Sequence, residues 1–222
     1  MVKKKIRVNG LLKIGKGEHI TDLQKNGTIY CNTIKSFREF ETQDLNRRDE
    51  REGAYKTEYL DPSKLKLLID GKELPVKFTS ARLNLFDNSI QNHKLYCLYG
   101  FKPEYAHGDP FIDEQNCRFG NKALLIKDTY EFIIRVKEKL RDLDLDFQYD
   151  WVNYYTEGEI NESLSVFHKP DDFKHQSEFR FYIKHEALKP LKFSIGSIED
   201  ISMIVETKKL PKLSLTPIEE VS

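Results

Sequence analysis

The segment Phe173-Lys-His-Gln-Ser-Glu-Phe-Arg-Phe-Tyr-Ile-Lys184 decides the fold. From Gln176 to Lys184 it alternates with a period of two, which predicts a strand with one face in the core. The expected core face carries Ser177, Phe179, Phe181 and Ile183. The opposite face carries Gln176, Glu178, Arg180, Tyr182 and Lys184.

The polar face of this strand has three interpretations. Most polar strand faces only meet water, so a solvated face is the base expectation. A second interpretation is the wall of an active site, with Glu178 as its carboxylate. In a third, Glu178 and Arg180 form a structural ion pair that braces the strand.

Patterns elsewhere predict further strands and helices around this segment. The expected strands are 6–14, 28–33, 65–69, 74–78, 94–101, 123–126, 149–155, 164–168, 191–195 and 201–205. Helices are expected at 18–25, ended by Asn26-Gly27, and at 34–40. A third follows Asp128, which has Glu131 three places on in a capping-box arrangement, and carries Ile133, Val136, Leu140 and Leu143 at helical spacing.

Strands therefore outnumber helices and do not alternate with them one for one. This favours an α+β fold with mostly antiparallel sheets and few helices over a doubly wound parallel sheet. The length of 222 residues fits a single domain, 1–222. Within it we expect an inserted hairpin in residues 56–92, turning at Asp70-Gly71, and a loosely held tail, 209–222.

Composition limits the classes of function. The 36 basic and 36 acidic residues cancel, so a general polyanion-binding surface is not implied. No apolar run approaches the ~20 residues of a membrane span, and no signal peptide is recognisable. The three cysteines, Cys31, Cys97 and Cys117, are widely spaced, which favours packed, reduced thiols in a cytoplasmic protein without membrane contact.

The run Asn46-Arg-Arg-Asp-Glu-Arg-Glu-Gly53 is a loop by composition. It is either a solvated charge run or a loop that folds over an anionic ligand. In the second case Arg47, Arg48 or Arg51 would contact phosphate groups. We expect this loop to border the same pocket as Glu178.

Familiar catalytic signatures are absent from the sequence. There is no phosphate-binding glycine loop, no H-E-x-x-H and no G-x-S-x-G. The histidines lack the spacing of zinc ligands, so no metal is expected. The Glu206-Thr-Lys208 match to a nuclease E-x-K is a third and weaker hypothesis.

Gln176-Ser-Glu178 on a late strand, after an early strand–helix–Gly–strand unit, resembles the ADP-ribosyltransferase fold. The opening unit carries Leu11-Leu-Lys-Ile-Gly, Ile20-Thr-Asp-Leu and Asn26-Gly-Thr-Ile-Tyr30. The resemblance implies a split-sheet core, NAD as substrate, Glu178 as the catalytic carboxylate and Gln176 as the acceptor-contacting residue. Lys13 stands where that superfamily has Arg or His, and Tyr30 or Thr33 would replace its Ser-Thr-Ser.

The same resemblance assigns the remaining site residues. A fixed carboxylate would stabilise an oxocarbenium-like transition state at the ribose. Arg180 or Lys169 would pair with the diphosphate or hold Glu178, and Arg48 would add a phosphate contact. Tyr30 or Tyr155 would stack on the nicotinamide ring.

A larger part of the chain resembles a widespread bacterial domain family of unknown function that shares a late E-[WF]-R strand. The matching segments are the opening unit, Phe37-Arg-Glu-Phe, Arg51-Glu-Gly53, Arg118-Phe-Gly120, Val152-Asn-Tyr-Tyr155, Phe167-x-Lys169 and Gln176-x-Glu-Phe-Arg180. Proximity of that family to mobile or phage-related genes implies a defence or toxin role. Two functions therefore stay open. One is an NAD-using transferase or glycohydrolase with a nucleotide ligand and a protein or nucleic-acid acceptor; the other is a non-enzymatic binding or regulatory module.

Overall fold

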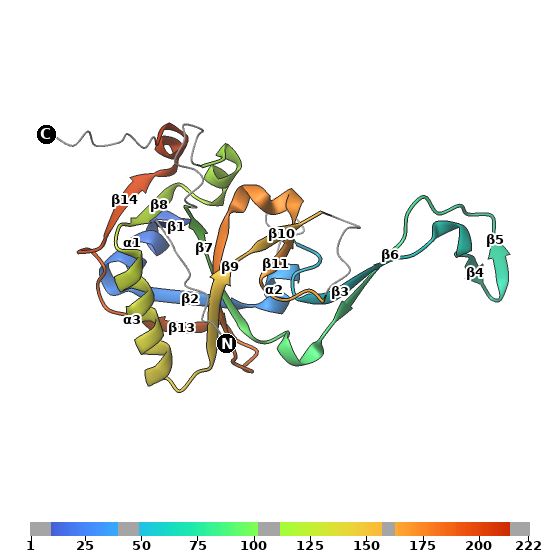
Figure 1. The fold of residues 1–222 in the computed structure, drawn as a ribbon, viewed down its shortest axis with the longest axis horizontal. Helices are drawn as coiled ribbons and strands as arrows, with labels where there is room; N and C mark the ends of the chain where they lie inside the picture. The colour runs from blue at the N-terminus through green and yellow to red at the C-terminus, as the bar shows by residue number, and fades with distance from the viewer. Residues whose placement is uncertain (1–9, 40–48, 102–111, 157–162, 214–222) are drawn as a thin grey trace, which may run out of the picture.

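The structure is a computed structural model that describes residues 10–39, 49–101, 112–156, 163–213 (Figure 1). Its main element is an eight-stranded sheet. The strands of this sheet are β1 (Leu11–Gly15), β2 (Thr28–Thr33), β7 (Lys94–Gly100), β8 (Lys122–Ile126), β9 (Phe147–Trp151), β12 (Glu178–Ile183), β13 (Leu191–Ser194) and β14 (Ser202–Glu206). Three α-helices are described: α1 (Gly17–Asn26), α2 (Ile34–Glu39) and α3 (Thr129–Asp142).

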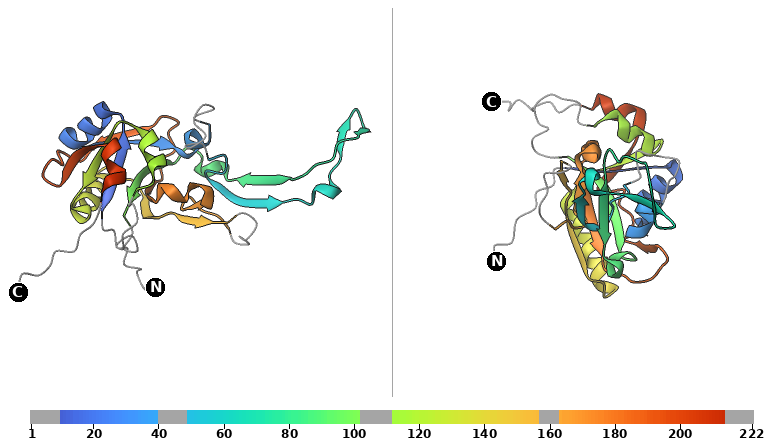
Figure 2. Two further views of the ribbon diagram at one scale, coloured as in Figure 1. Left: turned by 90° about the horizontal axis from the view of Figure 1, so that it is seen from above. Right: turned by 90° about the vertical axis from the view of Figure 1, so that its right-hand side faces the viewer.

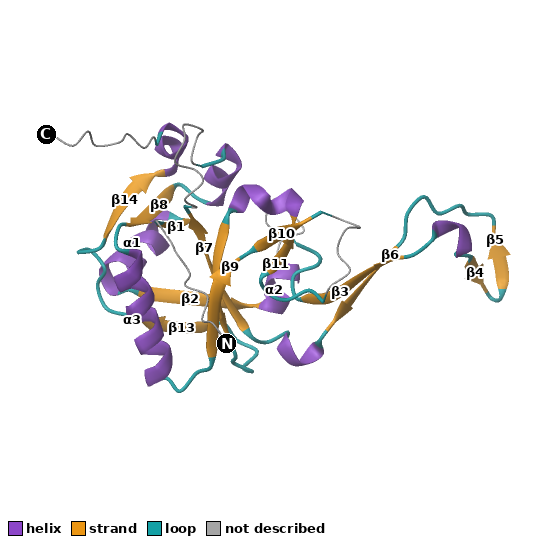
Figure 3. Ribbon diagram, in the orientation of Figure 1, coloured by secondary structure: helices purple, strands orange, loops and turns teal. Residues whose placement is uncertain are grey.

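Three two-stranded sheets complete the described part (Figure 3). They pair β3 (Ala54–Tyr59) with β6 (Arg82–Phe86), β4 (Leu67–Ile69) with β5 (Lys72–Leu74), and β10 (Asn153–Tyr155) with β11 (His168–Pro170). Only the β10–β11 pair among the described strands is parallel. The predicted α+β class with mostly antiparallel pairing is therefore confirmed.

Strand β7 is the hub of the large sheet. One of its edges pairs with β12 along its length, from Lys94 opposite Ile183 to Tyr99 opposite Glu178. The other edge is shared, because β1 pairs with Tyr99 and Gly100 while β2 pairs with Lys94 and Leu95. The expectation that the first strand and the Gln176–Lys184 strand belong to one sheet is thus confirmed.

Lys13 contacts β7 between the stretch that pairs with β1 and the stretch that pairs with β2. Its Nζ donates a hydrogen bond of 2.7 Å to the carbonyl oxygen of Cys97, which lies between the two paired stretches of β7. The ammonium also lies 4.3 Å from the centre of the Tyr96 ring, a cation–π distance. Lys13 therefore satisfies a backbone acceptor that the sheet itself leaves open.

The main core lies between the sheet and two helices. Ile20 and Leu23 of α1 and Phe132, Val136 and Leu140 of α3 pack against the face of β7 and β12 that carries Tyr96, Phe179 and Phe181. The two predicted caps are confirmed. Gly27 ends α1 with a left-handed φ of 61°, and Asp128 begins α3, where its Oδ1 accepts from the Glu131 N–H at 2.9 Å. None of the described helices combines the length and apolar character needed to cross a membrane.

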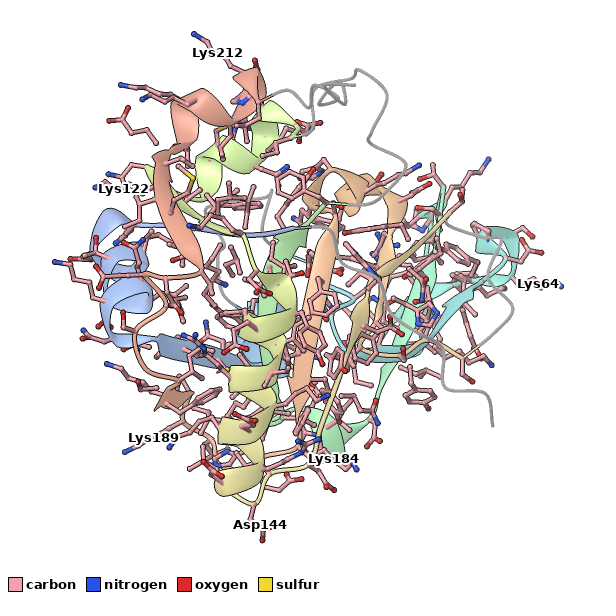
Figure 4. All side chains as sticks on the ribbon, turned by 60° about the vertical axis from the view of Figure 1, so that its left-hand side comes forward. Lys64, Lys122, Asp144, Lys184, Lys189 and Lys212 are labelled. Atoms are coloured by element: carbon pink, nitrogen blue, oxygen red, sulfur yellow. The ribbon has the colours of Figure 1, made fainter. Side chains whose placement is uncertain are left out.

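Residues 54–86 leave the body as an arm that contains β3, β4, β5 and β6 (Figure 1, Figure 2). Its far end is the predicted Asp70-Gly71 hairpin, with φ 49° at Asp70 and 75° at Gly71. The left view of Figure 2 shows the arm projecting away from the remainder of the molecule, and in the right view the arm points toward the viewer in front of the body. In Figure 4, the side chain of Lys64 marks the arm and points outward.

Several predicted elements need correction. The expected strand 149–155 is two strands, because Val152 N–H bonds to the Glu178 carbonyl and Asn153 N–H to the Phe167 carbonyl. The strand expected at 164–168 is displaced to His168–Pro170. Leu143, which was expected on the apolar side of the third helix, follows α3 as an exposed residue. A 3₁₀ helix that the patterns did not predict covers Glu114–Phe119. The tail is packed as far as buried Leu210, and residues 214–222 lie outside the described ones.

Candidate functional site

The start of β12 is positioned by a tight turn. Pro170 ends β11, and the 3₁₀ helix η5 (Asp171–Gln176) leads to Ser177, which has a left-handed φ of 39°. Ser177 is locked to β7, since its Oγ donates to the Gly100 carbonyl at 2.8 Å and its own carbonyl accepts from the Gly100 N–H. This turn brings Lys169 and Gln176 back over the first residue of the strand, Glu178.

Four charged side chains meet on the face of β12 that is opposite to the helices. We call them the ion cluster: Glu52, Lys169, Glu178 and Arg180. Glu178 Oε1 accepts from Lys169 Nζ at 2.7 Å, and Oε2 accepts from Arg180 Nε at 2.6 Å. Arg180 Nη1 and Nη2 each donate to one oxygen of Glu52 at 2.8 Å, a bidentate pair.

Neutral groups complete the cluster. Arg180 Nη1 also donates to the Val166 carbonyl at 2.6 Å, and Lys169 Nζ donates to Gln176 Oε1 at 2.6 Å. The ammonium of Lys169 lies 4.6 Å from the centre of the Phe173 ring. Two cations thus match two carboxylates, and their remaining hydrogen-bonding capacity goes to the protein.

The ion cluster is buried, so the prediction of a solvated polar face on β12 is wrong. The side chains of Arg180 and Glu52 are 1% and 2% exposed, and those of Lys169 and Glu178 are 5% and 8% exposed. All six residues of β12 are buried. The covering layer comes from Glu52 and from the segment that contains Val166 and Lys169.

Burial and pairing oppose each other in the pKa values of the cluster. Burial alone would raise the pKa of Glu178, but Arg180 and Lys169 hold it well below its usual range. Burial alone would lower the pKa of Lys169, yet Glu178 raises it above its usual value. Both groups are therefore charged at neutral pH, and each depends on the other for this state.

This geometry makes the cluster a brace between segments that are far apart in the chain. Both oxygens of Glu178 are engaged, so a ligand could reach this carboxylate only by displacing Lys169 or Arg180. A buried charge that loses its partner is strongly unfavourable. The cluster thus joins the loop before β3, strand β11 and the central sheet.

An open depression of about 440 Å³ lies beside the cluster. It is lined by Tyr154, Thr156, Asp171, Asp172 and Lys174. Tyr154 connects it to the strand, because its hydroxyl accepts from the Glu178 N–H at 2.9 Å. Burial raises the pKa of Tyr154, which keeps the phenol protonated.

The sequence-predicted residues separate into two groups. Gln176, Glu178, Lys169 and Arg180 are brought together. Tyr155 is buried one residue beyond Tyr154, which is the tyrosine that bonds to Glu178. Lys13 and Tyr30 lie elsewhere: Lys13 contacts β7 at Cys97, and Tyr30 is exposed on β2, opposite Lys192 of β13.

The charged loop, residues 46–53, contacts the ion cluster through the carboxylate of Glu52. Residues 46–48, with Arg47 and Arg48, lie outside the described residues, while Arg51 is half-buried. Glu52 contacts Arg180, which pairs with Glu178, so the described part of this loop reaches the ion cluster. The depression is lined by neither Glu178 nor a described residue of this loop, and the shared pocket stays a prediction. Sequence reasoning looked for phosphate partners among the arginines and missed Glu52, although Arg51-Glu-Gly53 had been singled out as a motif.

Thiol and metal chemistry find little support in the described part. Burial raises the pKa of Cys31 and of Cys97 to about 12, so neither is a ready nucleophile. No group of three or more potential metal ligands occurs among the described residues.

The arm presents a second candidate surface, which is apolar. Of the thirteen exposed large hydrophobic side chains among the described residues, eight lie on it. They are Tyr55, Tyr59, Leu60, Leu67, Leu68, Ile69, Val76 and Leu83. Leu68 and Ile69 at the hairpin are 59% and 58% exposed. Comparison of the chain with family models, with curated proteins and with solved structures found no match.

Proposed function

We propose that this protein is a non-enzymatic binding module that docks onto a protein partner through the hairpin end of its arm. The observation that carries the proposal is the concentration of exposed apolar side chains on residues 55–83. Isolated apolar residues on a surface need no explanation, but a contiguous patch is typical of an interaction site. The ion cluster then serves as the internal brace of the body that carries the arm.

The hairpin chemistry favours a protein partner with an apolar surface. Leu67, Leu68 and Ile69 form consecutive exposed positions on β4, and burying such side chains contributes about 1.5–3 kcal/mol each. The neighbouring charges largely compensate one another: Lys66 pairs with Glu73 at 2.7 Å and Lys64 with Asp61 at 3.7 Å. The patch therefore offers apolar area rather than a strong field of one sign.

The test is affinity capture from the cells that produce the protein, followed by titration of the purified partner. Leu68→Ser combined with Ile69→Ser should weaken binding at least tenfold, which corresponds to the loss of about 1.4 kcal/mol. Leu188→Ser is the matched control, because Leu188 is also exposed but lies off the arm. Equal binding by a chain that lacks residues 61–80 would refute the proposal.

A second candidate function is an NAD-using ADP-ribosyltransferase-like enzyme, either a transferase or an NAD glycohydrolase. The observation that favours it is the grouping of Gln176 and Lys169 around Glu178 beside an open depression. The β1–α1–β2 unit that splits from one edge of β7 supports the resemblance on which this candidate rests. In this function Glu178 would stabilise an oxocarbenium-like transition state once a ligand displaced Lys169.

NAD turnover separates the two candidates. An enzyme would release nicotinamide from NAD, and Glu178→Gln would reduce this rate by ~10²–10³ while the fold persists. A binding module leaves NAD intact with every acceptor tried. Glu178→Gln then acts on stability alone, measured as the melting temperature of the same preparations.

A further inference from the structure

Among the described strands, only β3 pairs with β6, and the centre of the other edge of β6 is Asn84. Leu60 N–H bonds to the Ala81 carbonyl, so the alternation of an antiparallel ladder directs the backbone groups of Leu83 and Leu85 toward β3 and those of Asn84 away from it. Among the described residues, no group bonds to the outward N–H or C=O of Asn84. The side chain of Asn84 accepts from Thr57 Oγ1 at 3.2 Å on β3.

The three central residues of this edge are symmetric about Asn84. The edge reads Arg82-Leu83-Asn84-Leu85-Phe86, with one leucine on each side of the asparagine and a cation and an aromatic ring at its ends. A two-fold axis through Asn84 would place Leu83 opposite Leu85 of a second copy, and would do so twice. In a non-hydrogen-bonded pair of this kind the Cα atoms are about 4.5 Å apart and the side chains touch.

We propose that two copies of this chain associate through their β6 edges, which forms a four-stranded antiparallel sheet of β3 and β6 from each copy. This inference goes beyond the proposed function, because it concerns another part of the arm and a second copy as the partner. The association is isologous, since the same edge serves both copies. Asn84 and its counterpart exchange backbone hydrogen bonds at the centre.

The charges on the same face agree with this pairing. Lys56 and Glu58 form an ion pair of 2.6 Å on β3, and they lie directly opposite Leu85 and Leu83. Each row across the four strands would therefore read acid, leucine, leucine, lysine. The central leucines are covered, and no two like charges meet across the new edge.

The pairing is favoured because a four-stranded sheet is more stable in water than a two-stranded ribbon. A two-stranded ribbon is marginal in water by itself, whereas three or more strands with an apolar face are stable. Leu83 is 44% exposed on the ribbon, so its contact with a second leucine removes apolar area from water. An unprotected strand edge is also a template for another strand, and here its own symmetry selects a second copy.

The experiment measures the molar mass of the full chain by sedimentation equilibrium over a range of concentrations. The wild-type chain should show a monomer–dimer equilibrium. Asn84→Asp places two like charges at the two-fold axis and should raise the dissociation constant at least about fivefold. Thr79→Asp is the control: it adds the same charge to an exposed position of the arm outside β6 and should leave the dissociation constant unchanged.

A charge-complementation test fixes the register. Asn84→Lys should also weaken the self-association, whereas a mixture of the Asn84→Asp and Asn84→Lys chains should form mixed dimers. Only a pairing that places both residues 84 together produces this recovery, even if either variant loosens its own arm. A wild-type chain that stays monomeric, a dimer that Asn84→Asp leaves intact, or a mixture that does not associate overturns the proposal.

Discussion

At the scale of single residues, Glu178 gives the sharpest stability prediction. Glu178→Gln leaves Arg180 and Lys169 buried with one carboxylate instead of two, so the free energy of unfolding should fall by ~3–5 kcal/mol. Urea denaturation measures this change. Glu73→Gln removes the exposed partner of Lys66 and should cost at most about 1 kcal/mol. Equal effects of the two substitutions would contradict the bracing role.

The depressed pKa of Glu178 predicts how stability depends on pH. An unfolded glutamate titrates near ~4.3, and the folded group titrates lower because of Arg180 and Lys169. Its contribution is therefore complete above the unfolded pKa and is lost as the pH falls through the folded pKa. Between pH 5 and pH 2, taken as an approximate window around these values, the wild-type chain should lose more stability than Glu178→Gln. Parallel curves for the two chains would count against it.

Residue patterns predicted part of the cluster, for an identifiable reason. Glu178 and Arg180 share one face of β12, while Gln176 and Lys169 precede this strand by a short turn, so the local sequence was enough to bring them together. Glu52 is 128 positions from Arg180, and no local rule connects them. Burial of the polar face depends on this distant partner and on Val166, which explains why a solvated face was the base expectation.

At the scale of elements, glycine substitutions distinguish a crowded turn from an open one. Gly27 and Gly71 both have positive φ, so alanine costs about 1 kcal/mol in backbone strain at either position. A Cβ at Gly27 would also lie 1.9 Å from the Gly196 carbonyl oxygen, whereas one at Gly71 meets nothing within 4 Å. Gly27→Ala should therefore lower the melting temperature far more than Gly71→Ala, as thermal denaturation would show. Similar shifts would mean that the Gly196 segment yields.

Elements with local signals were predictable, and those that depend on a change of partner were not. The cap at Asp128, the stop at Gly27 and the strand β2 follow from adjacent residues. The break at Val152 does not, because there the chain leaves β12 for β11, and only the folded structure determines this change. The strand at His168–Pro170 exists because β10 provides its parallel partner.

At the scale of the whole molecule, the α+β class followed from the ratio and order of strands and helices. The order of strands in the sheet did not, since pairs such as β13 with β2 join segments more than 150 residues apart in the printed sequence. The arm shows the same division. Its turn was predictable from Asp70-Gly71, but its projection from the body depends on the absence of covering contacts in the described structure.

Strand β7 pairs with β12 on one edge and with β1 and β2 on the other, and this central position predicts slow hydrogen exchange of its amides. Its amides bond to strands in the middle of the sheet and next to the main core, so we expect them to exchange with deuterium only when the sheet as a whole unfolds. The hairpin of β4 and β5 should exchange orders of magnitude faster, because few apolar contacts hold it. Exchange followed by mass spectrometry reads both segments in one experiment, and equal protection of the two would contradict this gradient. The exchange rate of the β7 amides thus reports the rate at which the whole sheet unfolds.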